Sequence, residues 1–188
     1  EDAWTTMGRT VQIMDNLIAQ GKARPMIVVM TNGNANQAGS QNDIPLAAVQ
    51  RQMTMVDYAK YWGKFEESLV KDVMPFIEKN YRTYTDKSHR AIAGLSMGGM
   101  HTQTITNNNP GVFDYIGVFS MGILNFGPQQ AANQNAGEKD PKIEALKNSG
   151  YKLYWIGCGV DDFLYEGVIK LRKKLDDHNF KYTYREST

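Results

Sequence analysis

Residues 94–99 read Gly94-Leu95-Ser96-Met97-Gly98-Gly99, directly after the apolar run 89–93 and directly before a helical stretch. This is the pattern of a nucleophile elbow, in which a serine at a sharp strand-to-helix turn exposes its hydroxyl above a sheet. We expect glycine at 94 and 98 because a side chain at either position would collide where strand and helix nearly touch. The backbone N–H of Met97 then points to the same space and can stabilise an oxyanion. The alternative is an ordinary glycine-rich turn that meets the pattern by chance.

Length and composition favour one globular domain with a sizeable core. The chain has 188 residues, of which 41% are hydrophobic and 22% charged, with a net charge of +1. That charge, without a basic cluster, argues against nucleic-acid binding, and no apolar stretch is long enough to cross a membrane. Cys158 is the only cysteine, which we interpret as a small buried hydrophobe and not as a reactive thiol. No His, Cys and Asp group has metal-ligand spacing, so we predict no metal and no cofactor.

Predicted strands and helices alternate along the chain. Helical spacing is found in 4–18, closed by Gly21, in 45–81 with a kink or restart at Pro75, after Ser96, and in 141–147 and 164–175. The predicted strands are Met26–Thr31, the run before Ser96, Tyr115–Ser120, Tyr151–Gly157 and Lys181–Glu186. This order predicts an α/β protein with five strands in a predominantly parallel sheet and helices on both faces.

Loop lengths indicate which edge of this sheet binds a ligand. Connections that leave the carboxyl ends of the predicted strands are long and polar, as in 32–42, 122–140 and 157–163, whereas those entering the amino ends are shorter. In open α/β sheets ligands bind outside the carboxyl ends of strands, which is the edge where Ser96 lies. The alternative is that surface loops vary in length without a functional reason.

A serine hydroxyl becomes a good nucleophile when a base takes its proton and a carboxylate orients that base. In α/β-hydrolases the order along the chain is Ser, then Asp or Glu, then His. Asp161 and Asp162 follow the strand Tyr151–Gly157 at the correct edge, so we predict that one of the pair is this carboxylate. Either aspartate could instead cap the helix that follows.

None of the three histidines suits the role of base. His89 and His178 precede predicted strands and belong at the opposite edge, and His101 lies five residues into the helix after Ser96, well below the hydroxyl. We therefore interpret all three as structural or surface residues. The required position is the loop after the last strand, where the sequence stops at Thr188. We expect residues 1–188 to be a single domain truncated at both ends, without its first strands, its first oxyanion loop or its last loop.

With these motifs the sequence resembles the esterase D-like family of α/β-hydrolases, which includes feruloyl esterases of carbohydrate esterase family one. The resemblance covers almost the whole chain and is best marked at 1–4, 25–33, 90–99, 113–120, 157–162 and 182–186. It implies that Ser96 is the nucleophile and Met97 an oxyanion donor, and it favours Asp162 over Asp161. In such proteins a His-Gly-rich turn precedes the opening tract, and a glycine-rich turn with the catalytic histidine follows the closing one. Both lie outside this sequence.

The resemblance also implies a secreted or periplasmic protein that acts on plant cell-wall glycans, with attached xylanase or carbohydrate-binding domains. The resulting prediction is a serine carboxylesterase that removes feruloyl or other hydroxycinnamoyl groups from xylan, and that is inactive as residues 1–188 alone. Loop placement suggests Asn32, Gly33, Leu124 and Phe126 as substrate contacts, the last two for an aromatic acyl group. Two alternatives stay open: an acetyl xylan esterase or other esterase D-like acyl hydrolase or transferase, and a non-catalytic carbohydrate-binding module that has lost its histidine.

Overall fold

The computed structural model describes residues 3–31, 33, 64–123 and 139–188. The chain divides into two compact units, Glu1–Arg51 and Gln52–Thr188. Described parts of the first unit include a π-helical turn, η1 (Ala3–Met7), and helix α1 (Thr10–Ala19). As predicted, α1 ends before Gly21, whose φ of 65° is a conformation that glycine adopts without steric cost.

The apolar run Met26–Thr31 differs from its prediction as a buried strand. It has no assigned strand structure, and the side chains of residues 26–30 are between 40% and 55% exposed. A run of β-branched and apolar residues favours an extended backbone, but a strand also needs a neighbour that pairs with its N–H and C=O groups. The described part of the first unit contains no strand with which this run could pair. The local sequence pattern alone therefore did not decide whether it forms a strand.

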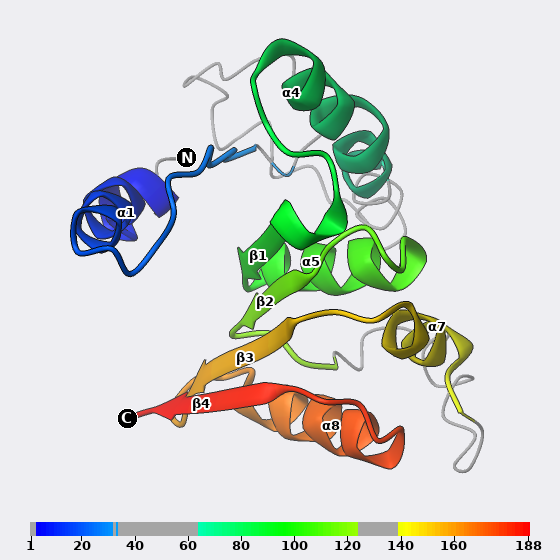
Figure 1. Cartoon of the computed structure of the whole chain (residues 1–188). Helices are drawn as coiled ribbons and strands as arrows, with labels where there is room; N and C mark the ends of the chain where they lie inside the picture. The colour runs from blue at the N-terminus through cyan, green and yellow to red at the C-terminus, as the bar shows by residue number, and fades with distance from the viewer. Residues whose placement is uncertain (1–2, 32, 34–63, 124–138) are drawn as a thin grey trace, which may run out of the picture. The chain divides into compact units, whose positions relative to one another are not determined.

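The second unit is built on a parallel sheet (Figure 1). Its strands are β1 (Ala91–Leu95), β2 (Tyr115–Phe119), β3 (Leu153–Gly159) and β4 (Thr183–Ser187), in the spatial order β1-β2-β3-β4. Ile92 pairs with Ile116, Ile116 with Tyr154, and Ile156 with Tyr184. The predicted parallel α/β arrangement is confirmed, although β1, β3 and β4 each begin two residues later than predicted.

Each pair of successive strands is joined through a helix. The connecting helices are α5 (Met97–Asn108), α7 (Pro141–Ser149) and α8 (Tyr165–Asp177). Because such crossovers are right-handed and the strands follow one another in sequence order, these three helices lie over the same face of the sheet. Helices on both faces were predicted, but the described connecting helices cover one face.

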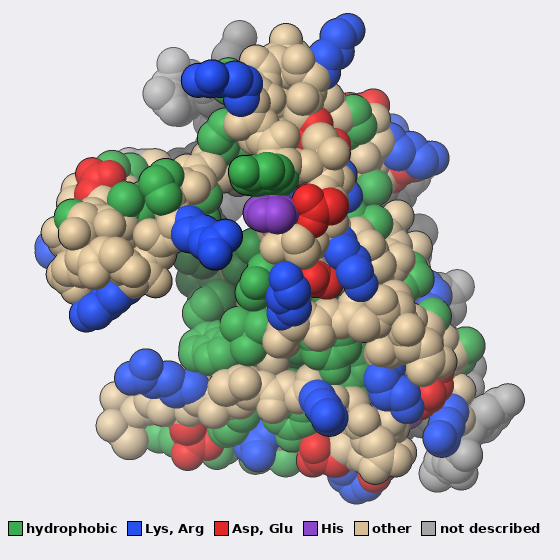
Figure 2. Space-filling view, viewed as in Figure 1, with side chains coloured by type: hydrophobic (Ala, Val, Ile, Leu, Met, Phe, Trp, Pro, Cys, Tyr) green, Lys and Arg blue, Asp and Glu red, His purple; other side chains and the backbone are tan. Residues whose placement is uncertain are grey.

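Side chains alternate accordingly along the strands. Val118, Ile156 and Cys158 are buried beneath the helices, whereas Leu95, Tyr115 and Leu153 are exposed. Figure 2 shows hydrophobic side chains gathered over the strands on the visible side of this unit. The core between sheet and helices consists of residues that share this buried position: Ile105, Phe113, Ile116, Val118, Met121, Ile143, Leu146, Tyr154, Ile156, Cys158, Val168, Leu171, Leu175 and Phe180.

A further helical stretch packs against this core. Residues 64–68 are α-helical, η2 (Leu69–Val73) is a π-helical turn, and α4 (Met74–Asn80) resumes the α-helix. The predicted restart at Pro75 is confirmed, because a proline has no N–H for the bond to the preceding turn and is tolerated near the start of a helix. Phe65, Leu69 and Met74 contact the core cluster.

Candidate active site

The turn at Ser96 has the geometry of a nucleophile elbow. Ser96 directly follows β1 and directly precedes α5, and its backbone has φ 54° and ψ −117°. A positive φ is uncommon for a residue with a Cβ and is held here from both sides. The Ser96 N–H donates to the Phe119 carbonyl at 2.9 Å, and its own carbonyl accepts from Met100 at 3.1 Å. The sequence motif therefore folds as the strand, strained turn and helix that it predicts.

The glycines of the turn differ in how closely their surroundings pack. A Cβ at Gly94 would lie 2.1 Å from the carbonyl oxygen of Gly98, which confirms that no side chain fits there. At Gly98 such a Cβ would meet no atom within 4 Å beyond its chain neighbours and the backbone of its own helix, so the predicted collision at that position is wrong. The close approach lies instead at Gly99, where a Cβ would be 2.7 Å from the Met121 Cβ. The helix turns Gly98 away from β1 and presents its backbone to Gly94.

Because of this difference, we expect Gly94→Ala and Gly98→Ala to have different effects on stability. Gly94→Ala should lower the free energy of unfolding by about 3 kcal/mol or more, because the clash is with backbone that cannot rotate away. Gly98→Ala should leave it unchanged or raise it by up to about 1 kcal/mol, because alanine favours a helix over glycine. Urea unfolding of the two variants measures both values, and equal losses would show that the packing around the turn is not as described.

Asp162 lies at the carboxyl end of β3, where a triad carboxylate was predicted. Its N–H donates to the Gly159 carbonyl at 3.2 Å, and its Oδ1 accepts from the Leu164 N–H at 2.8 Å. The side chain is half-buried, whereas Asp161 is exposed. The backbone contact resembles the capping role that was the alternative for these aspartates, and it also holds the Asp162 carboxylate in one orientation.

Cys158 lies beneath Asp162 and is buried, as predicted. Burial raises the pKa of the Cys158 thiol, and the negative charge of Asp162 raises it further. A hydrogen bond with the Asp162 side chain raises this pKa as well, whereas the Ser120 side chain lowers it. A thiol that holds its proton in this way is a poor nucleophile, which agrees with its interpretation as a structural residue.

A polar cluster at the end of β4 was not predicted from the sequence. Glu186 Oε2 accepts hydrogen bonds from the hydroxyls of Tyr165 at 2.7 Å and Tyr184 at 2.9 Å, and these lower the pKa of the Glu186 carboxyl. Burial is the main reason why the pKa of Tyr184 rises to about 12. The guanidinium carbon of Arg172 lies 3.9 Å from the centre of the Tyr184 ring. The Tyr-x-Glu spacing in a strand was the available signal. This cluster ties the end of β4 to α8.

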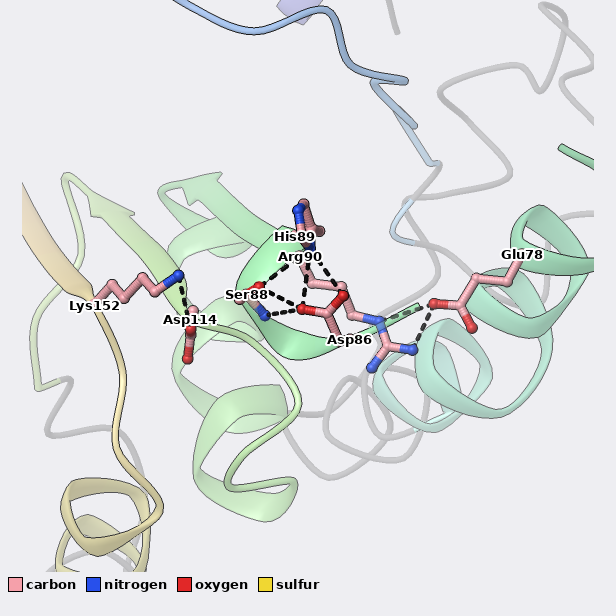
Figure 3. Close-up of polar contacts among 7 residues, drawn as sticks. All are labelled: Glu78, Asp86, Ser88, His89, Arg90, Asp114 and Lys152. Carbon is pink, nitrogen blue, oxygen red and sulfur yellow. Dashed lines mark hydrogen bonds and ion pairs between the residues drawn. The ribbon is translucent and has the colours of Figure 1, made fainter. Parts of the chain in front are cut away.

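His89 lies at the opposite edge of the sheet, as predicted. The Asp86 carboxylate accepts from the Ser88 N–H at 3.0 Å, which caps the 3₁₀ turn η3 (Lys87–His89), and it contacts the Ser88 hydroxyl and His89 Nδ1 (Figure 3). Hydrogen bonds from Ser88 and His89 lower the pKa of Asp86 to about 2. Although Ser, His and Asp meet here, serine and aspartate both contact the same ring nitrogen. A proton relay needs both nitrogens, so this is a capping arrangement and not a second triad.

Figure 3 also shows two ion pairs that hold the amino edge of the sheet. Arg90 donates to one Glu78 oxygen from Nε at 2.8 Å and from Nη2 at 2.6 Å, which joins α4 to the start of β1. Lys152 Nζ lies 3.7 Å from the buried carboxylate of Asp114. These contacts are structural and lie away from the turn at Ser96.

The other two histidines also have structural partners. The Nε2 of His178 accepts from the Asp140 N–H at 2.7 Å, and its Nδ1 donates to the Lys174 carbonyl at 2.7 Å, so both ring nitrogens are engaged by the backbone. The buried His101 has its Nδ1 3.1 Å from Glu66 Oε1. These contacts agree with the interpretation of the three histidines as structural or surface residues.

Of the four predicted substrate contacts, Gly33 lies within the described residues. Asn32, Leu124 and Phe126 lie outside the described residues, and Gly33 belongs to the first unit, half-buried. Within the described ranges no group of three or more His, Cys, Asp or Glu side chains is arranged to hold a metal ion. No described helix has both the length and the apolar character needed to cross a bilayer.

Comparisons with known proteins agree with this geometry. Residues 2–160 match the family model described as putative esterase. The chain is 36% identical over 181 residues to an endo-1,4-beta-xylanase/feruloyl esterase of Xylanibacter ruminicola, an alignment that covers 96% of this chain and 21% of that protein. It is 28% identical over 152 residues to endo-1,4-beta-xylanase Y of Acetivibrio thermocellus, covering 73% of this chain and 11% of the relative. The chain thus spans about a fifth or less of these relatives.

Solved structures show the same likeness. A ferulic acid esterase matches with a TM-score of 0.64 and 25% identity, over 99% of this chain and 71% of the other. The carbohydrate esterase family one ferulic acid esterase of Anaeromyces mucronatus, in complex with ferulic acid, matches with a TM-score of 0.66 and 20% identity, over 91% and 60% of the two chains. The chain therefore belongs to the esterase family of that model and has the α/β-hydrolase fold of the feruloyl esterases.

Proposed function

We propose that this chain is the acyl-transferring part of a secreted serine esterase that hydrolyses feruloyl or related hydroxycinnamoyl esters on xylan. The observation that carries the proposal is the strained backbone of Ser96, which projects from the carboxyl end of β1 at the first residue before α5. The names of the relatives support the assignment of a feruloyl ester on xylan as the substrate. They also support the proposal that xylanase domains are attached in the natural protein.

In this proposal Ser96 Oγ attacks the ester carbonyl carbon while a histidine takes the hydroxyl proton. We expect that histidine outside the present sequence, because all three histidines described above have structural partners. The Met97 N–H donates to the developing oxyanion, and Asp162 orients the histidine. The C–O bond to the sugar then breaks, and the sugar leaves with the proton that the histidine returns. Water hydrolyses the resulting acyl-serine by the same steps in reverse order.

The position of Asp162 supports its role beside Ser96. The two residues follow β1 and β3, whose carboxyl ends meet the same edge of the sheet with β2 between them. Asp161 is exposed, whereas Asp162 is held by backbone hydrogen bonds and faces the buried Cys158 thiol. A carboxylate fixed in this manner loses little orientational freedom when it engages a histidine.

The assay that tests the proposal uses the full-length natural protein and arabinoxylan that carries both feruloyl and acetyl groups. We expect ferulate to be released, and residues 1–188 alone to release none. Release of acetate without ferulate would contradict the acyl assignment and favour an acetyl xylan esterase. Release of neither acid, with retained binding to the polysaccharide, would favour a non-catalytic carbohydrate-binding module.

A further inference from the structure

We propose that residues Met121–Ile123, here called the spacer segment, set the separation between Ser96 and Asp162 by contacting the first turn of the helix that follows each of them. This role rests on the proposed function. The segment begins one residue after Ser120, whose N–H donates to the Gly157 carbonyl at 2.8 Å and whose φ is 45°. The positive φ turns the chain out of β2 toward the helices.

On one side the spacer segment packs against α5. Met121 is buried, and its Cβ would lie 2.7 Å from a Cβ placed at Gly99. Gly99 belongs to the same helical turn as Ser96, whose carbonyl accepts from the Met100 N–H at 3.1 Å. A displacement of Met121 against Gly99 is therefore transmitted to the backbone that holds the serine.

On the other side the backbone of the segment lies close to the backbone of α8 at Gly167. A Cβ at Gly122 would lie 1.9 Å from the Gly167 carbonyl carbon, and a Cβ at Gly167 would lie 3.0 Å from the Ile123 carbonyl oxygen. The Ile123 N–H donates to the Gly167 carbonyl at 2.9 Å. Paired glycines that bring two backbones this close leave no side chain whose rotation could absorb a shift.

The α8 contact is in turn tied to Asp162. Gly167 lies in the first turn of α8, and that turn begins with a hydrogen bond from the Tyr165 N–H to the Asp162 carbonyl at 2.9 Å. The Asp162 carboxylate is held by the Leu164 N–H one residue earlier. The spacer segment is therefore in contact with the first turns of the two helices that follow Ser96 and Asp162, and the two contacts lie within three residues of each other. Positions 121–123 act through these turns and do not touch the reacting atoms.

The test compares Gly99→Ala, Gly167→Ala and their double variant in the full-length protein, with Glu166→Ala as the matched control. Glu166 precedes Gly167 in the first turn of α8, and its side chain is exposed. Gly167→Ala requires Ile123 to move by a few tenths of an ångström, and we expect kcat to fall about tenfold with little change in KM. In the double variant the segment is blocked from both sides, so the loss should exceed the product of the single losses.

Thermal unfolding is measured on the same preparations, and Glu166→Ala is expected to keep the kcat of the natural protein. If Gly99→Ala fails to fold, Gly167→Ala alone decides, because its contact is the milder one. A folded Gly167→Ala variant with unchanged kcat, or single losses that simply multiply and follow the unfolding temperature, would overturn the spacer role while leaving ferulate release sensitive to Ser96→Ala. A rate that survives Ser96→Ala would overturn the proposed function and the spacer role together.

Discussion

Ser96→Ala is expected to lower kcat for ferulate release from feruloylated arabinoxylan by at least about 10⁴-fold, because the proposed acyl-enzyme bond forms on the Ser96 hydroxyl. Binding of the substrate should change little, since the variant loses one hydroxyl from an exposed turn. Initial rates by chromatography of released ferulate, with substrate binding by calorimetry, measure the two quantities separately.

Ser120 provides the matched control for this prediction. It follows β2 at the same edge and also has a positive φ, 45° against 54° at Ser96, but its side chain contacts the buried Cys158 thiol. Ser120→Ala should therefore keep kcat within about tenfold of the natural protein, the range expected for loss of one hydrogen bond. A similar loss in both variants would point to disturbance of the sheet edge and not to a nucleophile at Ser96.

Asp162→Asn is expected to lower kcat by about 10³- to 10⁴-fold, because an amide cannot stabilise the imidazolium that forms when the histidine takes a proton. The substitution separates this role from helix capping. Asparagine caps a helix as well as aspartate does, and its side-chain oxygen can keep the hydrogen bond from the Leu164 N–H. The free energy of unfolding should accordingly change by less than about 1 kcal/mol.

Asp161→Asn is the control, since Asp161 is the exposed neighbour. We expect it to keep kcat within a few-fold of the natural protein. Equal kcat values for Asp162→Asn and the natural protein would mean that the Asp162 carboxylate only holds the backbone turn before α8. A large loss in Asp161→Asn instead would move the carboxylate role to that residue.

Features that depend on residues close together in the sequence could be predicted. The strand, turn and helix around Ser96 occupy consecutive positions, and β2 begins at the predicted Tyr115. The structural roles of His89 and His178 followed from their positions before strands. The interpretation of Cys158 as buried followed from its place at the end of an apolar strand.

Features that depend on distant partners could not be predicted in the same way. Met26–Thr31 has the composition of a buried strand, but pairing requires another strand, and none is described in its unit. The spacing around Ser96 suggested a collision at Gly98, whereas the crowded position is Gly99, because its neighbour is Met121 from the segment after β2. The hydrogen bond from Tyr165 to Glu186 joins residues 21 positions apart and leaves no local pattern.

In the proposed mechanism Ser96 carries the acyl group during turnover. The direct test mixes the full-length protein with a feruloyl ester, stops the reaction with acid within the first turnovers, and identifies the modified peptide by mass spectrometry. We expect a feruloyl group on the peptide that contains Ser96, and none in the Ser96→Ala variant. A feruloyl group on another residue, or turnover by Ser96→Ala at the natural rate, would contradict it.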